Sequence, residues 1–326
     1  MKKIHAKSSC CGTKIVRFGE RRKRCTKCLR TWRPRKKKRG RKQKRVSKNI
    51  VEKYFSNLLP SFYAKAKEHE KEPDSDEYRL QKSRDLFLRT TDWPTLPEDG
   101  PLILVADAKR KKVRGKMTTV YLILVRPISE STAFIHRPHI EEGNETVNGW
   151  DRAFDTLPSS VKNRVLALVC DGHRGLVYSA KWRKWKIQRC NFHLIKSLTV
   201  RRSVRSTRGH AVVGTKILSL AEIILTTKDA ELLRRSISEI EAIGWEARSG
   251  SLRAVVTGFL NHLEEYRTYI LFPELHLPRT SNSGESFICG LQKVFSRAHG
   301  FSTKKSFVLW TECYAKWRKK IACNPS

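Results

Sequence analysis

The chain has 326 residues, a formal net charge of +37 and 39% hydrophobic residues. This apolar content suffices for a folded core, but no apolar run approaches the roughly 18 residues of a membrane-spanning helix. The basic N-terminus lacks the apolar core of a signal peptide, so we expect an intracellular, cytoplasmic protein.

Positive charge is concentrated at the N-terminus. Residues 1–50 contain 22 lysines and arginines and a single acid, Glu20. Such a charge indicates a polyanionic partner whose binding weakens steeply with salt. A solvated basic tail or a nuclear-type address is the alternative interpretation.

Residues 1–33 are typical of a small zinc-ribbon-like module. Cys25 and Cys28 form a C-x-x-C knuckle, and Cys10 and Cys11 precede it by a spacer of 13 to 14 residues. The first pair of the ribbon is incomplete, since Ser8 stands three positions before Cys11. We therefore expect a zinc site built from Cys11, Cys25, Cys28 and a fourth ligand, either Cys10 or His5. A degenerate ribbon without metal is the alternative.

A basic linker and a helical segment follow. Residues 34–45 cannot pack a core and are predicted to bind DNA phosphates through a run of cations: Lys36, Lys37, Lys38, Arg39, Arg41 and Lys42. Residues 46–91 are predicted to be helical, with apolar residues at helical spacing up to Leu59 and a charged break near Pro73. This segment is expected to bind DNA, to dimerise, or simply to pack.

Residues 100–193 carry the pattern of a β-β-β-α-β core. Apolar runs predict strands at 102–106, 117–125 and 131–137, with a basic turn over 109–116. A helix is expected over 141–157, and the apolar run Val165–Cys170 predicts the fourth strand. Asp107 and Asp171 each follow such a run, and Gly172 then marks a turn. The first and fourth strands are expected to be parallel neighbours.

The remainder of the chain is predicted to be largely helical. After a short helix at 174–181 and a strand near 185–189, residues 194–278 have helical apolar periodicity throughout. Residues 279–326 begin with R-T-S-N-S-G-E, which places Glu285 in the first turn of an amphipathic helix, and a further helix is expected over 308–321.

Three carboxylates are the candidate catalytic groups. Asp107 and Asp171 at neighbouring strand ends, joined by Glu285 from a crossing helix, would offer the oxygen ligands that Mg²⁺ prefers. Two such ions clamp the attacking and leaving oxygens of a phosphodiester displacement. Crowded carboxylates repel one another, so their pKa values are expected to rise without metal. The alternatives are strand-end turn residues for the two aspartates and a capping box with Asn282 for Glu285.

Four motifs together resemble Mutator-like transposases of bacterial insertion sequences. They are L-V-A-D at 104–107, C-D-G-H-R-G-L at 170–176, Q-R-C-N-F-H at 188–193 and R-T-S-N-S-G-E at 279–285. The resemblance implies a ribonuclease H-like mixed α/β core, an all-helical insertion before the glutamate, and an Asp-Asp-Glu triad at Asp107, Asp171 and Glu285. It also implies two Mg²⁺ or Mn²⁺ ions on that triad, and an N-terminal zinc ribbon occurs in some relatives.

The same resemblance matches Cys190 and His193 to the family's C-x-x-H pair. Two ligands are too few for a closed zinc site, so we expect these residues to shape the turn beside the triad. His173 and Arg174, which follow the second aspartate, are expected to contact phosphate, with a capping or solvent-exposed role as the alternative.

We therefore expect a DNA transposase that cleaves transposon ends and transfers the freed 3′-hydroxyl into target DNA. Its DNA partners would be the terminal inverted repeats of the transposon and the target, both double-stranded. We also expect a dimer or larger assembly of the chain, because two transposon ends must be joined. Two alternatives remain: a domesticated transposase that regulates by binding DNA, and a ribonuclease H-like nuclease without strand transfer.

Overall fold

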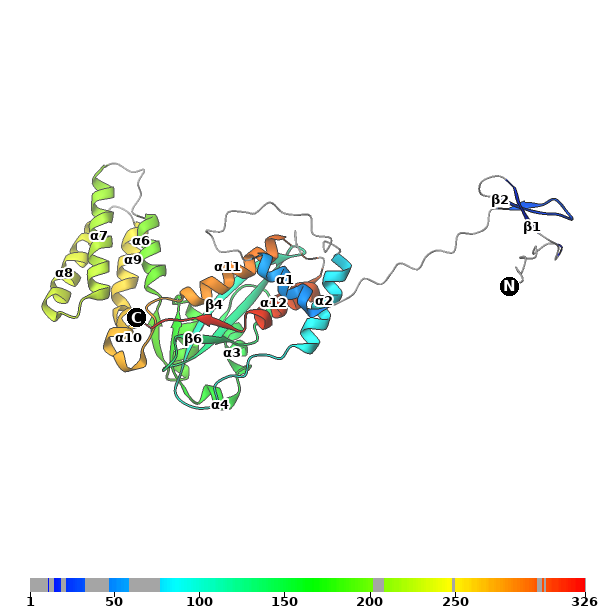
Figure 1. Cartoon of the computed structure of the whole chain (residues 1–326). Helices are drawn as coiled ribbons and strands as arrows, with labels where there is room; N and C mark the ends of the chain where they lie inside the picture. The colour runs from blue at the N-terminus through cyan, green and yellow to red at the C-terminus, as the bar shows by residue number, and fades with distance from the viewer. Residues whose placement is uncertain are drawn as a thin grey trace. The chain divides into compact units, whose positions relative to one another are not determined.

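The computed structural model describes residues 11, 15–18, 22–32, 47–58, 77–201, 208–247, 250–297, 301 and 303–325. The chain divides into two compact units, residues 1–45 and 46–326 (Figure 1). Among the described residues, no helix is both long and apolar enough to cross a membrane. Several positions with predicted roles lie outside the described residues: His5, Cys10, Lys36, Lys37, Lys38, Arg39, Arg41 and Lys42.

The first unit contains a small antiparallel sheet in the order β1-β2-β3. Its strands are β1 (Ile15–Phe18), β2 (Arg22–Cys25) and β3 (Thr31–Trp32). The loop after β2 is tight: Leu29 N donates to Cys25 O at 3.0 Å, and Leu29 has a positive φ of 59°. This turn brings Cys28 back beside Cys25.

The second unit is built on a mixed seven-stranded sheet in the order β10-β6-β5-β4-β8-β9, with β7 paired to β5. The strands are β4 (Leu102–Val113), β5 (Lys116–Pro127), β6 (Thr132–Ile135), β7 (His139–Glu142), β8 (Val165–Cys170), β9 (Lys186–Arg189) and β10 (Lys320–Ala322). β4 pairs parallel to β8, and β8 pairs parallel to β9. The mixed α/β class and the parallel pairing of the first and fourth strands of the core are confirmed.

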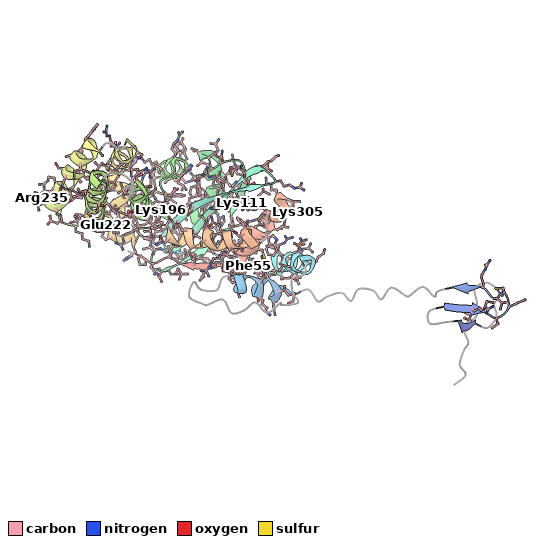
Figure 2. The ribbon with its side chains drawn as sticks, turned by 90° about the horizontal axis from the view of Figure 1, so that it is seen from above. Phe55, Lys111, Lys196, Glu222, Arg235 and Lys305 are labelled. Atoms are coloured by element: carbon pink, nitrogen blue, oxygen red, sulfur yellow. The ribbon has the colours of Figure 1, made fainter. Side chains whose placement is uncertain are left out.

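Helices cover both faces of this sheet. One face packs against α1 (Lys48–Leu58), α2 (Glu77–Thr90), α11 (Asn282–Arg297) and α12 (Lys304–Arg318). Phe55, labelled in Figure 2, is fully buried there, with the Trp310, Tyr314 and Trp317 rings of α12 5.2–6.2 Å away. The other face packs against α3 (Val147–Asp155), α4 (Ser159–Lys162) and α5 (Arg174–Trp182).

A block of helices lies between β9 and α11 in the chain, and its members gather into one group in Figure 1. They are α6 (Asn191–Arg201), α7 (Arg208–Thr226), α8 (Ala230–Glu246), α9 (Gly250–Asn261) and α10 (Leu263–Leu271), followed by the 3-10 turn η1 (Pro273–Leu275). The block has a core of its own that includes Ile217, Ile224 and Phe259. The predicted helical character is confirmed, but the first helix begins earlier than expected, at Asn191.

Three details of the sequence interpretation are wrong. The first strand does not end at Asp107: β4 continues to Val113, because Arg114 and Gly115, both with positive φ, form a two-residue turn that pairs the cations of β4 with β5. The start of the helix expected over 141–157 belongs to β7, which pairs with residues 118–121 near the start of β5. The end of the last helix, which contains Ile321, forms β10 and pairs with β6.

Candidate active site

Asp107 and Asp171 come from neighbouring parallel strands. Asp107 lies within β4, where its Oδ1 accepts from Ala108 N at 2.8 Å. Asp171 follows the last residue of β8, and its Oδ1 accepts from His173 N at 2.8 Å. Gly172 allows this turn, since its φ is +91° and a Cβ there would lie 2.6 Å from Nη1 of Arg189.

Glu285 approaches the same place from the opposite end of the chain. Its N–H donates to Ser281 O at 3.1 Å, within the first turn of α11. The preceding residue, Gly284, is so close to β4 that a Cβ would lie 3.1 Å from Cβ of Asp107 and 3.5 Å from its Oδ2. The structure therefore brings the first turn of α11 directly onto Asp107.

The segment before α11 is fixed to the end of β9. Ser281 N donates to Sγ of Cys190 at 3.2 Å, and Asn191 N donates to Arg279 O at 2.9 Å. Cys190 is fully buried, and its own N–H donates to Cys170 O at 2.7 Å. Cys190 thus links β8, β9 and the approach to Glu285, which the spacing of the C-x-x-H pair did not indicate.

His193 contacts the glutamate itself. Its Nε2 lies 3.3 Å from Oε1 of Glu285, which is an ion-pair distance. The two groups are not oriented for a hydrogen bond. Oε1 of Glu285 and Nδ1 of His193 are both buried and have no hydrogen-bond partner. The contact with Cys190 is the largest cause that raises the pKa of His193, to about 9, and the nearby Glu285 and Asp171 carboxylates raise it further. Burial opposes this change, as it does at Cys190, where the contact with His193 and the hydrogen bond from Ser281 lower the thiol pKa.

The acids interact with one another. Burial is the largest cause that raises the pKa of Asp107 to about 7, and the charges of Asp171 and Glu285 raise it further. A buried carboxylate oxygen without a donor, beside two further carboxylates, fits the oxygen coordination of Mg²⁺ or Mn²⁺. Cys190, His193 and Glu285 also have ligand atoms within 4.8 Å of one another, a softer donor set that suits zinc better than magnesium.

The other predicted positions lie elsewhere. Arg174 is exposed in the first turn of α5, and the residue before it, His173, caps that helix by accepting from Gly175 N at 3.1 Å. In the N-terminal unit, the thiols of Cys11, Cys25 and Cys28 lie within 4.8 Å of one another.

The raised pKa of Asp107, caused mainly by burial and further by its carboxylate neighbours, predicts a pH-dependent stability. A folded pKa of about 7, above the unfolded value of about 3.9, means that the stabilising, protonated form is complete at acid pH and is lost as pH rises through 7. In EDTA at pH 8, Asp107→Asn should therefore raise the free energy of unfolding by about 1–3 kcal/mol, with no gain near pH 4. Chemical denaturation of both proteins at the two pH values measures this. The exposed Asp99→Asn is the control, and an equal gain at both pH values would contradict the prediction.

A strongly basic chain with carboxylates clustered where β8 ends beside β4 in a mixed α/β sheet has the character of a nucleic-acid-processing enzyme. Residues 100–287 match the family model described as transposase, Mutator family. This match covers more than half of the chain, and the chain belongs to the Mutator family of transposases. No curated protein matches the chain.

Proposed function

We propose that the chain is a DNA transposase of the Asp-Asp-Glu type, with Asp107, Asp171 and Glu285 as its catalytic residues. The observation that carries this proposal is the convergence of the three acids, two from parallel strands and one from a helix over 100 residues later, in a Mutator-family chain. In this assignment the sheet and its helices form a ribonuclease H-like core from residues 100–193 and 279–326. Residues 194–278 form the all-helical insertion.

The three carboxylates would hold two Mg²⁺ or Mn²⁺ ions, which supply an activated water or 3′-hydroxyl and stabilise the leaving oxygen. The protein's own part is to place the acids. Asn191 and Ser281 anchor the segment that leads into α11. The positive charge of His193 offsets the negative charge of Glu285. Cys190 and His193 are therefore positioning residues in this proposal.

The test is a cleavage and joining assay with the chain and a duplex carrying the inverted repeat that flanks its coding region. We expect a Mg²⁺-dependent nick at the repeat end, followed by joining of the freed 3′-end to a second duplex. A nick without joining would favour a nuclease, and binding without a nick would favour a DNA-binding regulator. Crosslinking on paired ends tests the proposed dimer or larger assembly.

We also propose that residues 1–33 form a zinc ribbon that helps to grip DNA together with the basic linker 34–45, and that residues 46–91 bind DNA or a second subunit. The support for zinc is the cluster of three thiols beside the tight turn after β2. Because so small a sheet has little core, the metal would supply much of its folding free energy.

Metal analysis of the purified chain should find one zinc, and Cys25→Ser should lose it. Cys289→Ser, an exposed cysteine on α11 outside the thiol cluster, is the matched control. Comparing Cys10→Ala with His5→Ala identifies the fourth ligand. A chain that carries no zinc when purified without chelators would contradict the proposal.

A further inference from the structure

The far half of β4 is a basic strand with one open edge. After Asp107 the strand continues through Lys109, Arg110, Lys111 and Lys112. β5 pairs with β4 along its whole length, whereas β8 pairs with it only from Leu102 to Val105. In the part of the chain that the structure describes, no strand covers the β4 edge beyond Asp107.

The strand register divides these cations between two faces. Asp107 lies opposite Leu122 and Lys109 opposite Val120, and both β5 residues belong to the core beneath α11. Lys111, labelled in Figure 2, is two residues further along the same face. Arg110 and Lys112 alternate with them and share the opposite face with Ala108. Two lysines therefore share the face of the candidate catalytic acid, and two cations do not.

The spacing of the two lysines suits a polyanion that passes the acids. At a rise of about 3.4 Å per residue, Lys109 and Lys111 lie roughly 7 and 14 Å beyond Asp107 along the strand. That length corresponds to a few nucleotides of a DNA strand, at about 3.4 Å of duplex rise each. None of the four cations makes an ion pair with any residue that the structure describes. Their charge is available to a ligand.

We propose that Lys109 and Lys111 bind backbone phosphates on one side of the scissile phosphate, so that the DNA strand leaves the acids along the open edge of β4. The inference rests on the proposed function, because it takes Asp107 as part of the cutting site. The competing explanation is that cations on an open edge only prevent pairing with another chain. Protection of that kind does not distinguish the two faces of the strand.

The matched experiment compares two double variants with the same loss of charge, Lys109→Gln/Lys111→Gln and Arg110→Gln/Lys112→Gln. On the inverted-repeat duplex, Lys109→Gln/Lys111→Gln should cut at least about tenfold more slowly than the parent. The slope of the logarithm of its DNA-binding constant against the logarithm of salt concentration should also become less steep by up to about two. The second should stay within about threefold of the parent in cutting. Lys109→Arg/Lys111→Arg keeps the charge and should cut nearly normally. Equal losses in both glutamine variants, or none in the first, would overturn the inference.

Substitution of single phosphates by methylphosphonate locates the contacts. The parent should lose binding when phosphates within a few nucleotides on one side of the cut site are neutralised, and Lys109→Gln/Lys111→Gln should no longer respond to them. Equal sensitivity in parent and variant would overturn the inference. This readout uses binding without Mg²⁺, so it remains informative if the chain cuts no DNA. The two proposals can fail separately. If the parent cuts DNA and Lys109→Gln/Lys111→Gln behaves like the Arg110→Gln/Lys112→Gln control, the inference is wrong and the proposed function is unaffected.

Discussion

Asp171→Asn is expected to reduce Mg²⁺-dependent cleavage of the transposon end by about a thousandfold or more. Loss of a single group that stabilises charge in a transition state costs about 10²–10³ in rate, and loss of a residue that would hold the catalytic ions should cost at least as much. The substitution preserves shape, and the amide oxygen of asparagine can still accept from His173 N. Folding and DNA binding should therefore be retained.

The measurement is single-turnover cleavage beside duplex binding by the same preparation. Asp107→Asn and Glu285→Gln should show comparable losses, since all three acids serve one site. Asp151→Asn changes a carboxylate that contacts Ser179 and Arg183 on the other face of the sheet, and it should cut within a few-fold of the parent. If Asp171→Asn cuts within tenfold of the parent, the proposed catalytic role of the acids is wrong.

Much of the core was predictable because its signals are local. The run Val165–Cys170 is apolar, of strand length and followed by Asp171 and a glycine, and β8 has these same bounds. The far half of β4 was missed because its four consecutive cations hide the strand pattern. The signal that could have found it is the Arg114–Gly115 pair, a two-residue turn that aligns Lys116 with Val113.

Other features depend on contacts between distant segments. β7 and β10 are short, and their partners β5 and β6 are chosen by the tertiary fold. The same limit applies at the candidate site. The C-x-x-H pair gave no sign that Cys190 accepts from Ser281 N or that His193 lies against Glu285, because about 90 residues separate the partners. Only the return of the chain after α10 brings them together.

Loss of Arg126 should destabilise the fold strongly. It lies on β5 and is fully buried, yet it carries a guanidinium that donates to backbone carbonyls of three separate segments: Glu130, His276 and Cys323. His276 lies nine residues before Glu285 and has a positive φ of 47°, and Cys323 follows β10. Arg126 thus ties β5 to the C-terminus and to the chain that leads into α11.

Arg126→Met should lower the free energy of unfolding by about 3–5 kcal/mol, because it leaves buried carbonyls without donors. Arg164→Met is the matched control. Arg164 also donates to three carbonyls, of Pro97, Gly100 and Ser160, but it is only half-buried, so water can replace it and the loss should be about 1 kcal/mol. Chemical denaturation compares the two, and equal losses would show that burial of the guanidinium does not set the cost.

The same substitution separates stability from positioning. If Arg126 fixes the segment that carries Glu285, Arg126→Met should cut more slowly than the parent even at a temperature where both are fully folded. Arg164 donates to carbonyls in the segments that precede β4 and β8, away from the acids, so Arg164→Met should then cut like the parent. Normal cutting by folded Arg126→Met would mean that the bonds from Cys190 and Asn191 to the 279–281 segment are enough to place the glutamate.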